Sequence, residues 1–117
     1  MIVDTVDRAL KLVPPERIRI LAGSHLNESL RSLLPELPAE SFKIEPQVRG
    51  TAAALTWASW DIYNLDPEAV ILSLHADHII KPEEKFLSLI EDIVAVLETH
   101  DLLFTISVNP DREETGY

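Results

Sequence analysis

The chain contains no cysteine and only three glycines among its 117 residues. The absence of cysteine excludes disulfide bonds, a thiolate zinc site and a cysteine nucleophile. The glycines, Gly23, Gly50 and Gly116, are too few for the glycine-rich phosphate-binding loop of P-loop or dinucleotide-binding proteins. Any triphosphate would therefore have to be held by residues that this chain does not contain.

Positive charge and long apolar runs are also scarce. Ten Lys and Arg residues stand against twenty Asp and Glu residues, giving a formal net charge of -10, so nucleic acid and anionic membranes would be repelled on average. No apolar run approaches the ~18 residues of a membrane span, and Asp4 and Asp7 stand where a secretory signal would be basic. The length fits one domain, which we expect in the cytoplasm without a nucleic-acid or membrane partner.

Apolar spacing and proline positions divide the chain into alternating helices and strands. Helices are expected over residues 2–13, 26–34, 51–65 and 82–97, and strands over residues 18–22, 42–45, 69–74 and 102–108. This order predicts an α/β fold with a mostly parallel sheet and right-handed crossovers.

The third expected helix carries both tryptophans. Ala53, Trp57 and Trp60 are spaced i, i+4 and i+7, so they lie on one helical face. The tryptophan rings can stack on a base or pack in the core. Helical spacing among alanines favours the core.

Asp77 follows the apolar run 69–74 and would lie at the tip of the central strand. Ligands bind open α/β sheets at the carboxyl ends of their strands. One carboxylate suffices for Mg²⁺, which fills its other positions with water and substrate phosphates. The alternative is that Asp77 only caps its own turn.

Two histidines flank Asp77. On an extended strand His75 would share the face of Asp77, and His78 would lie on the opposite face. None of the four histidines shows metalloprotease spacing. A histidine metal site is therefore the less favoured interpretation, and packing at the strand end the more favoured one.

Gly50 and Thr51 precede the third helix. Threonine is a good N-cap, and a preceding glycine lets a ligand approach the free amides of the helix start. The alternative is capping without a ligand.

Three motifs occur in a fixed order and spacing: Glu45-Pro46-x-x-Arg49-Gly50-Thr51-Ala52, Leu74-x-Ala76-Asp77-His78 and Glu114-Thr115-Gly116-Tyr117. With these motifs the chain resembles the bacterial mannose-1-phosphate guanylyltransferases essentially end to end. The resemblance implies a Rossmann-like, three-layer αβα nucleotidyltransferase fold. It further implies that residues 1–117 form a single partial domain, lacking the N-terminal glycine-rich signature loop and the C-terminal part of the family.

The resemblance also implies an activity for the parent enzyme, which would make GDP-mannose and pyrophosphate from GTP and mannose 1-phosphate with Mg²⁺. It assigns the guanine nucleotide to Glu45, Arg49, Gly50 and Thr51, the catalytic metal to Asp77, and the sugar to Glu114, Thr115 and Gly116. Because the loop that grips the triphosphate is absent, the isolated chain is expected to be weakly active or inactive.

Two alternatives remain open. One is another sugar-1-phosphate nucleotidyltransferase, since Gly50, Ala53 and His75 stand where the family commonly has asparagine, proline and proline. The other is a noncatalytic α/β domain that binds a nucleotide sugar, which the missing loop favours. Unpaired strand edges favour pairing with another chain, so a homo-oligomer is compatible with either.

Overall fold

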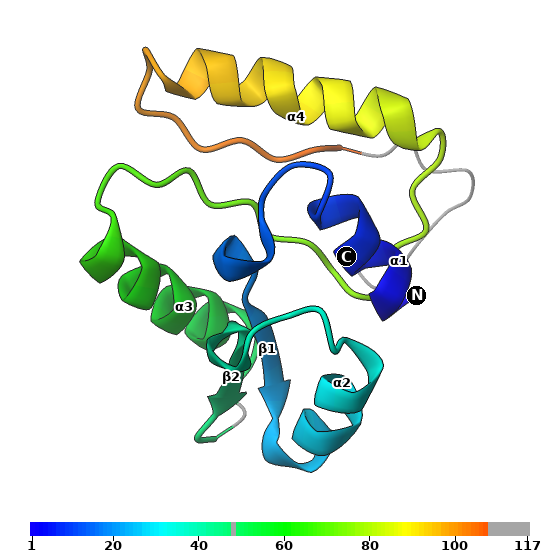
Figure 1. Cartoon of the computed structure of the whole chain (residues 1–117). Helices are drawn as coiled ribbons and strands as arrows, with labels where there is room; N and C mark the ends of the chain where they lie inside the picture. Colours follow the sequence, from blue (N-terminus) through cyan, green and yellow to red (C-terminus); the bar gives the residue numbers. More distant parts are fainter. Residues whose placement is uncertain (48, 108–117) are drawn as a thin grey trace, which may run out of the picture.

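The computed structural model describes residues 1–47 and 49–107. Within these ranges, helices and a parallel two-stranded sheet form an α/β fold (Figure 1), as predicted, and it is compatible with part of a Rossmann-like nucleotidyltransferase domain. The elements are α1 Ile2–Ala9, β1 Ile20–Gly23, α2 Asn27–Leu33, β2 Phe42–Glu45, α3 Thr51–Leu65 and α4 Glu83–Leu97. No helix in the described ranges has the length and apolar character needed to cross a membrane.

The sheet consists of β1 and β2, which pair in parallel. Parallel strands need a crossover connection, and the segment containing α2 provides it. The register pairs Ile20 with Phe42 and Gly23 with Glu45. Both strands therefore end at the same edge, where the chain leaves β2 toward α3.

The hydrophobic core lies where α1, α2 and the two strands meet. Its buried residues are Val6, Ile18, Leu34, Leu37 and Phe42. Leu34 follows α2 directly and is completely buried, whereas its neighbour Leu33 is 52% exposed. The prolines at 35 and 38 prevent α2 from continuing, so Leu34 and Leu37 turn into the core instead of extending the helix.

A charged contact joins α1 to α4. The buried Arg8 side chain has its Nε 3.9 Å from a carboxylate oxygen of Glu83, and its guanidinium lies 5.8 Å from the ring centre of Phe86. Among the described residues, Nε and Nη1 of Arg8 have no hydrogen-bond partner. Lys11 donates a hydrogen bond to Glu83, and this bond, together with the charge of Glu83, raises the pKa of Lys11. Glu83 thus offsets the charge of Arg8 on α1 and of Lys11 in the turn that follows it.

Two predicted strands are wrong. Residues 69–74 form no strand, and neither do residues 102–107; residue 108 lies outside the described residues. A strand needs a neighbour that completes its hydrogen-bond ladder. In the described part of the chain β1 and β2 pair with each other, while Val70 and Leu103 remain exposed. In the view of Figure 1, the segment 101–107 doubles back toward the start of α4 and does not join the sheet. Apolar, β-prone composition alone did not create a ladder.

The buried face predicted for α3 and the length predicted for α1 also need correction. Trp60 is 63% exposed and Trp57 is also exposed, so the expected tryptophan core is absent, and Ala58 is the buried residue of α3. Ala54 and Ala58 lie on the face of α3 that is turned toward the rest of the fold, the narrow face, and their small side chains let this face approach it. The larger indole rings of Trp57 and Trp60 are exposed to solvent. Helix α1 ends at Ala9, and residues 10–13 continue as turns.

Replacing Leu34 by Ala should destabilise the fold strongly. The change leaves a cavity in the core, and such substitutions cost about 2 to 5 kcal/mol. Leu33→Ala is the matched control, since it removes the same atoms from an exposed site and should change the free energy of unfolding by less than about 0.5 kcal/mol. Urea unfolding followed by circular dichroism measures both. Equal effects of the two variants would contradict this core.

Replacing Glu83 by Gln should destabilise the fold by about 1 kcal/mol, because Arg8 would then be buried without a counter-charge. The value lies below that of a fully buried pair because the Glu83 side chain is 32% exposed. Glu84→Gln controls for the favourable interaction of an acid with the first turn of α4. In urea unfolding, Glu84→Gln should cost less than Glu83→Gln; a cost as large would argue against the contact between α1 and α4.

Candidate functional site

The start of α3 is shaped by Gly50. Its backbone has φ +86° and ψ 169°, a region that is essentially restricted to glycine. Gly50 itself is the N-cap, without a side-chain cap, and Thr51 is the first helical residue, so the predicted capping role of Thr51 is wrong. Among the described residues other than Gly50 and its two chain neighbours, no heavy atom lies within 4 Å of where a Cβ on Gly50 would be. The first amides of α3, which lack intrahelical acceptors, therefore border open space.

A cavity of ≈ 300 Å³ lies beside this helix start. It is lined by Glu45, Pro46, Gln47, Arg49, Ala53, Ala54 and Trp57. Nε and Nη2 of Arg49 donate hydrogen bonds to Oε1 of Gln47, at 3.1 and 2.8 Å. The cavity thus combines a carboxylate, a guanidinium and an exposed indole. Trp57 reaches it because the helix turns this side chain away from the core.

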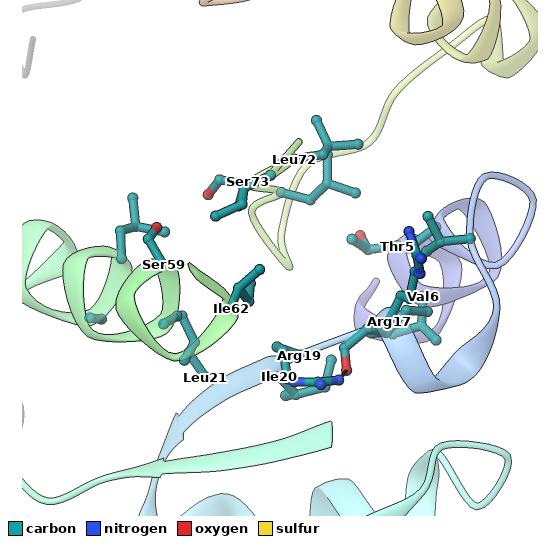
Figure 2. A pocket seen from close by; sticks show the side chains of 18 of the residues that line it. Thr5, Val6, Arg17, Arg19, Ile20, Leu21, Ser59, Ile62, Leu72 and Ser73 are labelled. Atoms are coloured by element: carbon teal, nitrogen blue, oxygen red, sulfur yellow. Dashed lines mark hydrogen bonds between the residues drawn. The ribbon is translucent and has the colours of Figure 1, made fainter. Parts of the chain in front are cut away.

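A larger cavity of ≈ 790 Å³ lies between α1, β1, α3 and the segment 69–76. Figure 2 shows Thr5 and Val6 at the right of the cavity, Ser59 and Ile62 at the left, and Leu72 and Ser73 above, across from Ile20 of β1. Its lining is mainly apolar, because α3 turns its narrow face here. The segment 69–76 and β1 lie on different sides of this cavity.

The same cavity brings together residues from two of the sequence motifs. Glu45, Gly50 and Thr51 of the first motif line it, and so do His75 and Ala76 of the second. These motifs lie more than twenty residues apart in the sequence. Their shared lining of one cavity is compatible with a common site.

Two cations of this cavity were missed by sequence reasoning. Arg17 and Arg19 both line it (Figure 2). Nη1 of Arg19 donates hydrogen bonds to the backbone oxygens of Glu16 and Ile18, at 2.6 and 2.9 Å. Its buried Nε has no partner among the described residues. The available signal was two arginines flanking Ile18 at a strand start, which is a common surface pattern.

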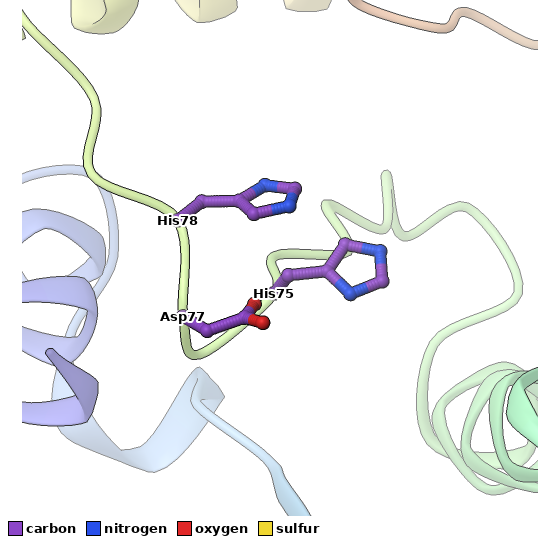
Figure 3. Close-up of side chains that lie close together, drawn as sticks. All are labelled: His75, Asp77 and His78. Carbon is purple, nitrogen blue, oxygen red and sulfur yellow. The ribbon is translucent and has the colours of Figure 1, made fainter. Parts of the chain in front are cut away.

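Asp77 does not lie at a strand tip. It occupies a turn with Ala76, and the side chains of His75, Asp77 and His78 are exposed. Figure 3 shows all three side chains extending to the same side of this turn. Their ligand atoms lie within 4.8 Å of one another, and the imidazole centres are 4.7 Å apart. The expectation that His78 would face away from Asp77 is wrong, because a turn replaces the alternation of a strand.

The residues expected to approach the sugar, Glu114, Thr115 and Gly116, lie outside the described residues. The described part of the predicted site therefore comprises the base-side residues, which are Glu45, Arg49, Gly50 and Thr51 and are expected to lie around the base, and the turn that carries Asp77. These two parts have different chemistry: the first offers hydrogen-bond donors and acceptors around a cavity, and the second offers metal ligands.

Comparison with known proteins gives sequence relatives of one kind, although no protein-family model matches the chain. The mannose-1-phosphate guanylyltransferase of Salmonella muenchen is 32% identical over 122 residues, covering 100% of this chain and 25% of that protein. Those of Salmonella montevideo and Escherichia coli (strain K12) are 37% and 34% identical, covering 78% and 67% of this chain. The chain spans at most a quarter of the length of these relatives. The predicted resemblance is therefore confirmed: this chain is related in sequence to a part of the mannose-1-phosphate guanylyltransferases.

Proposed function

We propose that this chain is one partial domain of a nucleotidyltransferase that makes GDP-mannose and pyrophosphate from GTP and mannose 1-phosphate. The observation that carries the proposal is the shared lining of the large cavity, to which Glu45, Gly50 and Thr51 contribute from one motif and His75 and Ala76 from another. The sequence relation agrees with this activity, since the relatives are named mannose-1-phosphate guanylyltransferases. Such an enzyme would work in the cytoplasm, where GTP is available.

The base-side residues suit a guanine nucleotide. The Glu45 carboxylate can accept hydrogen bonds from the N–H groups of guanine. Arg49 uses two N–H groups on Gln47 and retains others, and guanidinium pairs well with guanine O6 and N7. The free amides after Gly50 suit an anionic oxygen. The exposed Trp57 ring offers a stacking surface beside them.

Magnesium fits Asp77. The carboxylate is exposed at its turn, so a bound ion would keep positions for water and phosphate oxygens, as Mg²⁺ requires. When bound, Mg²⁺ would neutralise charge on the nucleotide phosphates. The histidines on either side are less suited to this hard ion than oxygen ligands are.

The reaction depends mainly on how its two substrates are positioned. An oxygen of mannose 1-phosphate attacks the α-phosphorus of GTP, and pyrophosphate leaves with the β- and γ-phosphates. No covalent nucleophile of the protein is needed, so orientation of the two substrates is the main contribution of these residues. Glu114, Thr115 and Gly116 would orient the sugar. Without a glycine-rich loop for the triphosphate, the 117 residues alone should have little or no activity.

Two alternatives are kept. The first is a nucleotidyltransferase for another sugar 1-phosphate or another base, since a change of specificity would need few changed contacts. The second is a noncatalytic domain that binds a nucleotide sugar, which the low glycine content favours. Exposed apolar side chains, such as Ile71 and Leu103, are compatible with self-association in either case. Selectivity among nucleotide sugars and dependence on Mg²⁺ separate these alternatives from the leading proposal.

Calorimetric titration with GDP-mannose, with and without Mg²⁺, tests the proposal on the chain itself. We expect binding that Mg²⁺ strengthens and that exceeds the binding of GDP-glucose and UDP-glucose. Asp77→Asn should remove the strengthening by Mg²⁺, about tenfold or ~1.4 kcal/mol, because the amide is a neutral ligand. Asp92→Asn, at an exposed site on α4, should retain it. Absence of nucleotide-sugar binding, or equal binding of UDP-glucose, would count against the assignment.

Replacing Trp57 by Leu should weaken GDP-mannose binding, since stacking of a base on an aromatic ring contributes about 1 to 3 kcal/mol. Trp60→Leu is the matched control: it changes the same residue type on the same helix, and Trp60 lies outside the lining of the smaller cavity. The same titration should show at least a roughly fivefold loss for Trp57→Leu and little change for Trp60→Leu. Equal losses would place the base elsewhere.

A further inference from the structure

We propose that His75, Asp77 and His78 bind one divalent transition-metal ion, such as Zn²⁺, in the absence of nucleotide. The turn at 76–77 directs two imidazoles and a carboxylate to one side (Figure 3). The three residues can each supply one ligand atom, and these atoms already lie within 4.8 Å of one another.

The geometry requires only small side-chain movements. Nitrogen and oxygen ligands lie about 2.0 to 2.2 Å from a tetrahedral Zn²⁺, so two ligands of one ion are about 3.3 to 3.6 Å apart. The ligand atoms of this turn lie within 4.8 Å of one another, so they must approach one another by roughly 1 Å. All three side chains are exposed, and rotation about their own torsions can close the remaining difference.

The kind of ligand selects the kind of ion. Imidazole suits zinc, nickel and copper, whereas Mg²⁺ prefers oxygen ligands. Two histidines with one carboxylate match the three protein ligands found at zinc sites that keep a fourth position open. Within residues 1–47 and 49–107, side-chain hydrogen bonds and ion pairs engage residues other than these three. No described partner therefore competes with the ion.

The site lies at the rim of the large cavity, because His75 also belongs to the cavity lining. An ion held here would border the space that the proposed nucleotide site occupies. Metal binding by this turn does not depend on guanylyl transfer, however. Failure of GDP-mannose to bind would leave the present proposal unaffected, and failure of Zn²⁺ to bind would leave the nucleotide site unaffected.

The test is a Zn²⁺ titration of the metal-free, tag-free chain in competition with a chromophoric chelator, in the presence of excess Mg²⁺. We expect one Zn²⁺ per chain. Removing even an indirect supporting partner of a metal ligand costs about 10- to 100-fold in affinity, so His75→Gln and His78→Gln should each weaken binding by at least about tenfold. The control is His25→Gln, at an exposed histidine outside the cluster, which should change the affinity less than about twofold, well below that range.

Nuclear magnetic resonance of the unmutated chain, labelled with ¹⁵N at histidine, provides a second measurement that does not depend on variants folding. Ring nitrogens of His75 and His78 should shift with Zn²⁺ and stop shifting at one equivalent, while Mg²⁺, which prefers oxygen ligands, should shift them far less. Shifts confined to His25 or His100 would overturn the proposal. So would undiminished Zn²⁺ affinity in His75→Gln and His78→Gln.

Discussion

The parallel pairing of β1 with β2 is the constraint on which the arrangement of the candidate site depends. Because Gly23 is opposite Glu45, both strands deliver the chain to one edge of the sheet. The crossover through α2 is held by Leu34, which is fully buried against α1 and the strands. A parallel pair cannot form through a tight turn, so the core beneath α2 and the position of Glu45 are coupled.

From that edge the chain reaches α3 through Gly50, whose positive φ permits the sharp change of direction. The helix then turns small side chains inward, including Ala54 and Ala58, and leaves Trp57 outside. With this orientation, α3 contributes to the lining of two cavities that differ in their chemistry. The larger is mainly apolar and bounded by the segment 69–76, whereas the smaller joins Trp57 to charged groups.

Charge sets a second requirement on any nucleotide site in this chain. With twice as many acids as basic residues, the average field opposes a phosphate group. Local cations must offset that field, and Arg17, Arg19 and Arg49 lie at the two cavities. A divalent ion at Asp77 would act in the same direction. The acidic composition therefore limits nucleotide binding to a small region rather than excluding it.

Local signals in the sequence determined much of the secondary structure. Strand β2 was predicted at residues 42–45, and helices α3 and α4 were predicted within one residue of their ends, because helical periodicity and proline act over a few neighbouring positions. The motifs around Glu45 and Asp77 likewise identified the sequence relation without any coordinates. Tertiary structure decided the rest. Residues 69–74 have the composition of a strand, but a ladder depends on a distant partner, which composition does not encode. The convergence of His75, Asp77 and His78 followed from the same cause: where no ladder holds the chain extended, a turn at 76–77 brings His78 to the side of His75 and Asp77, whereas strand geometry would have put it on the opposite face.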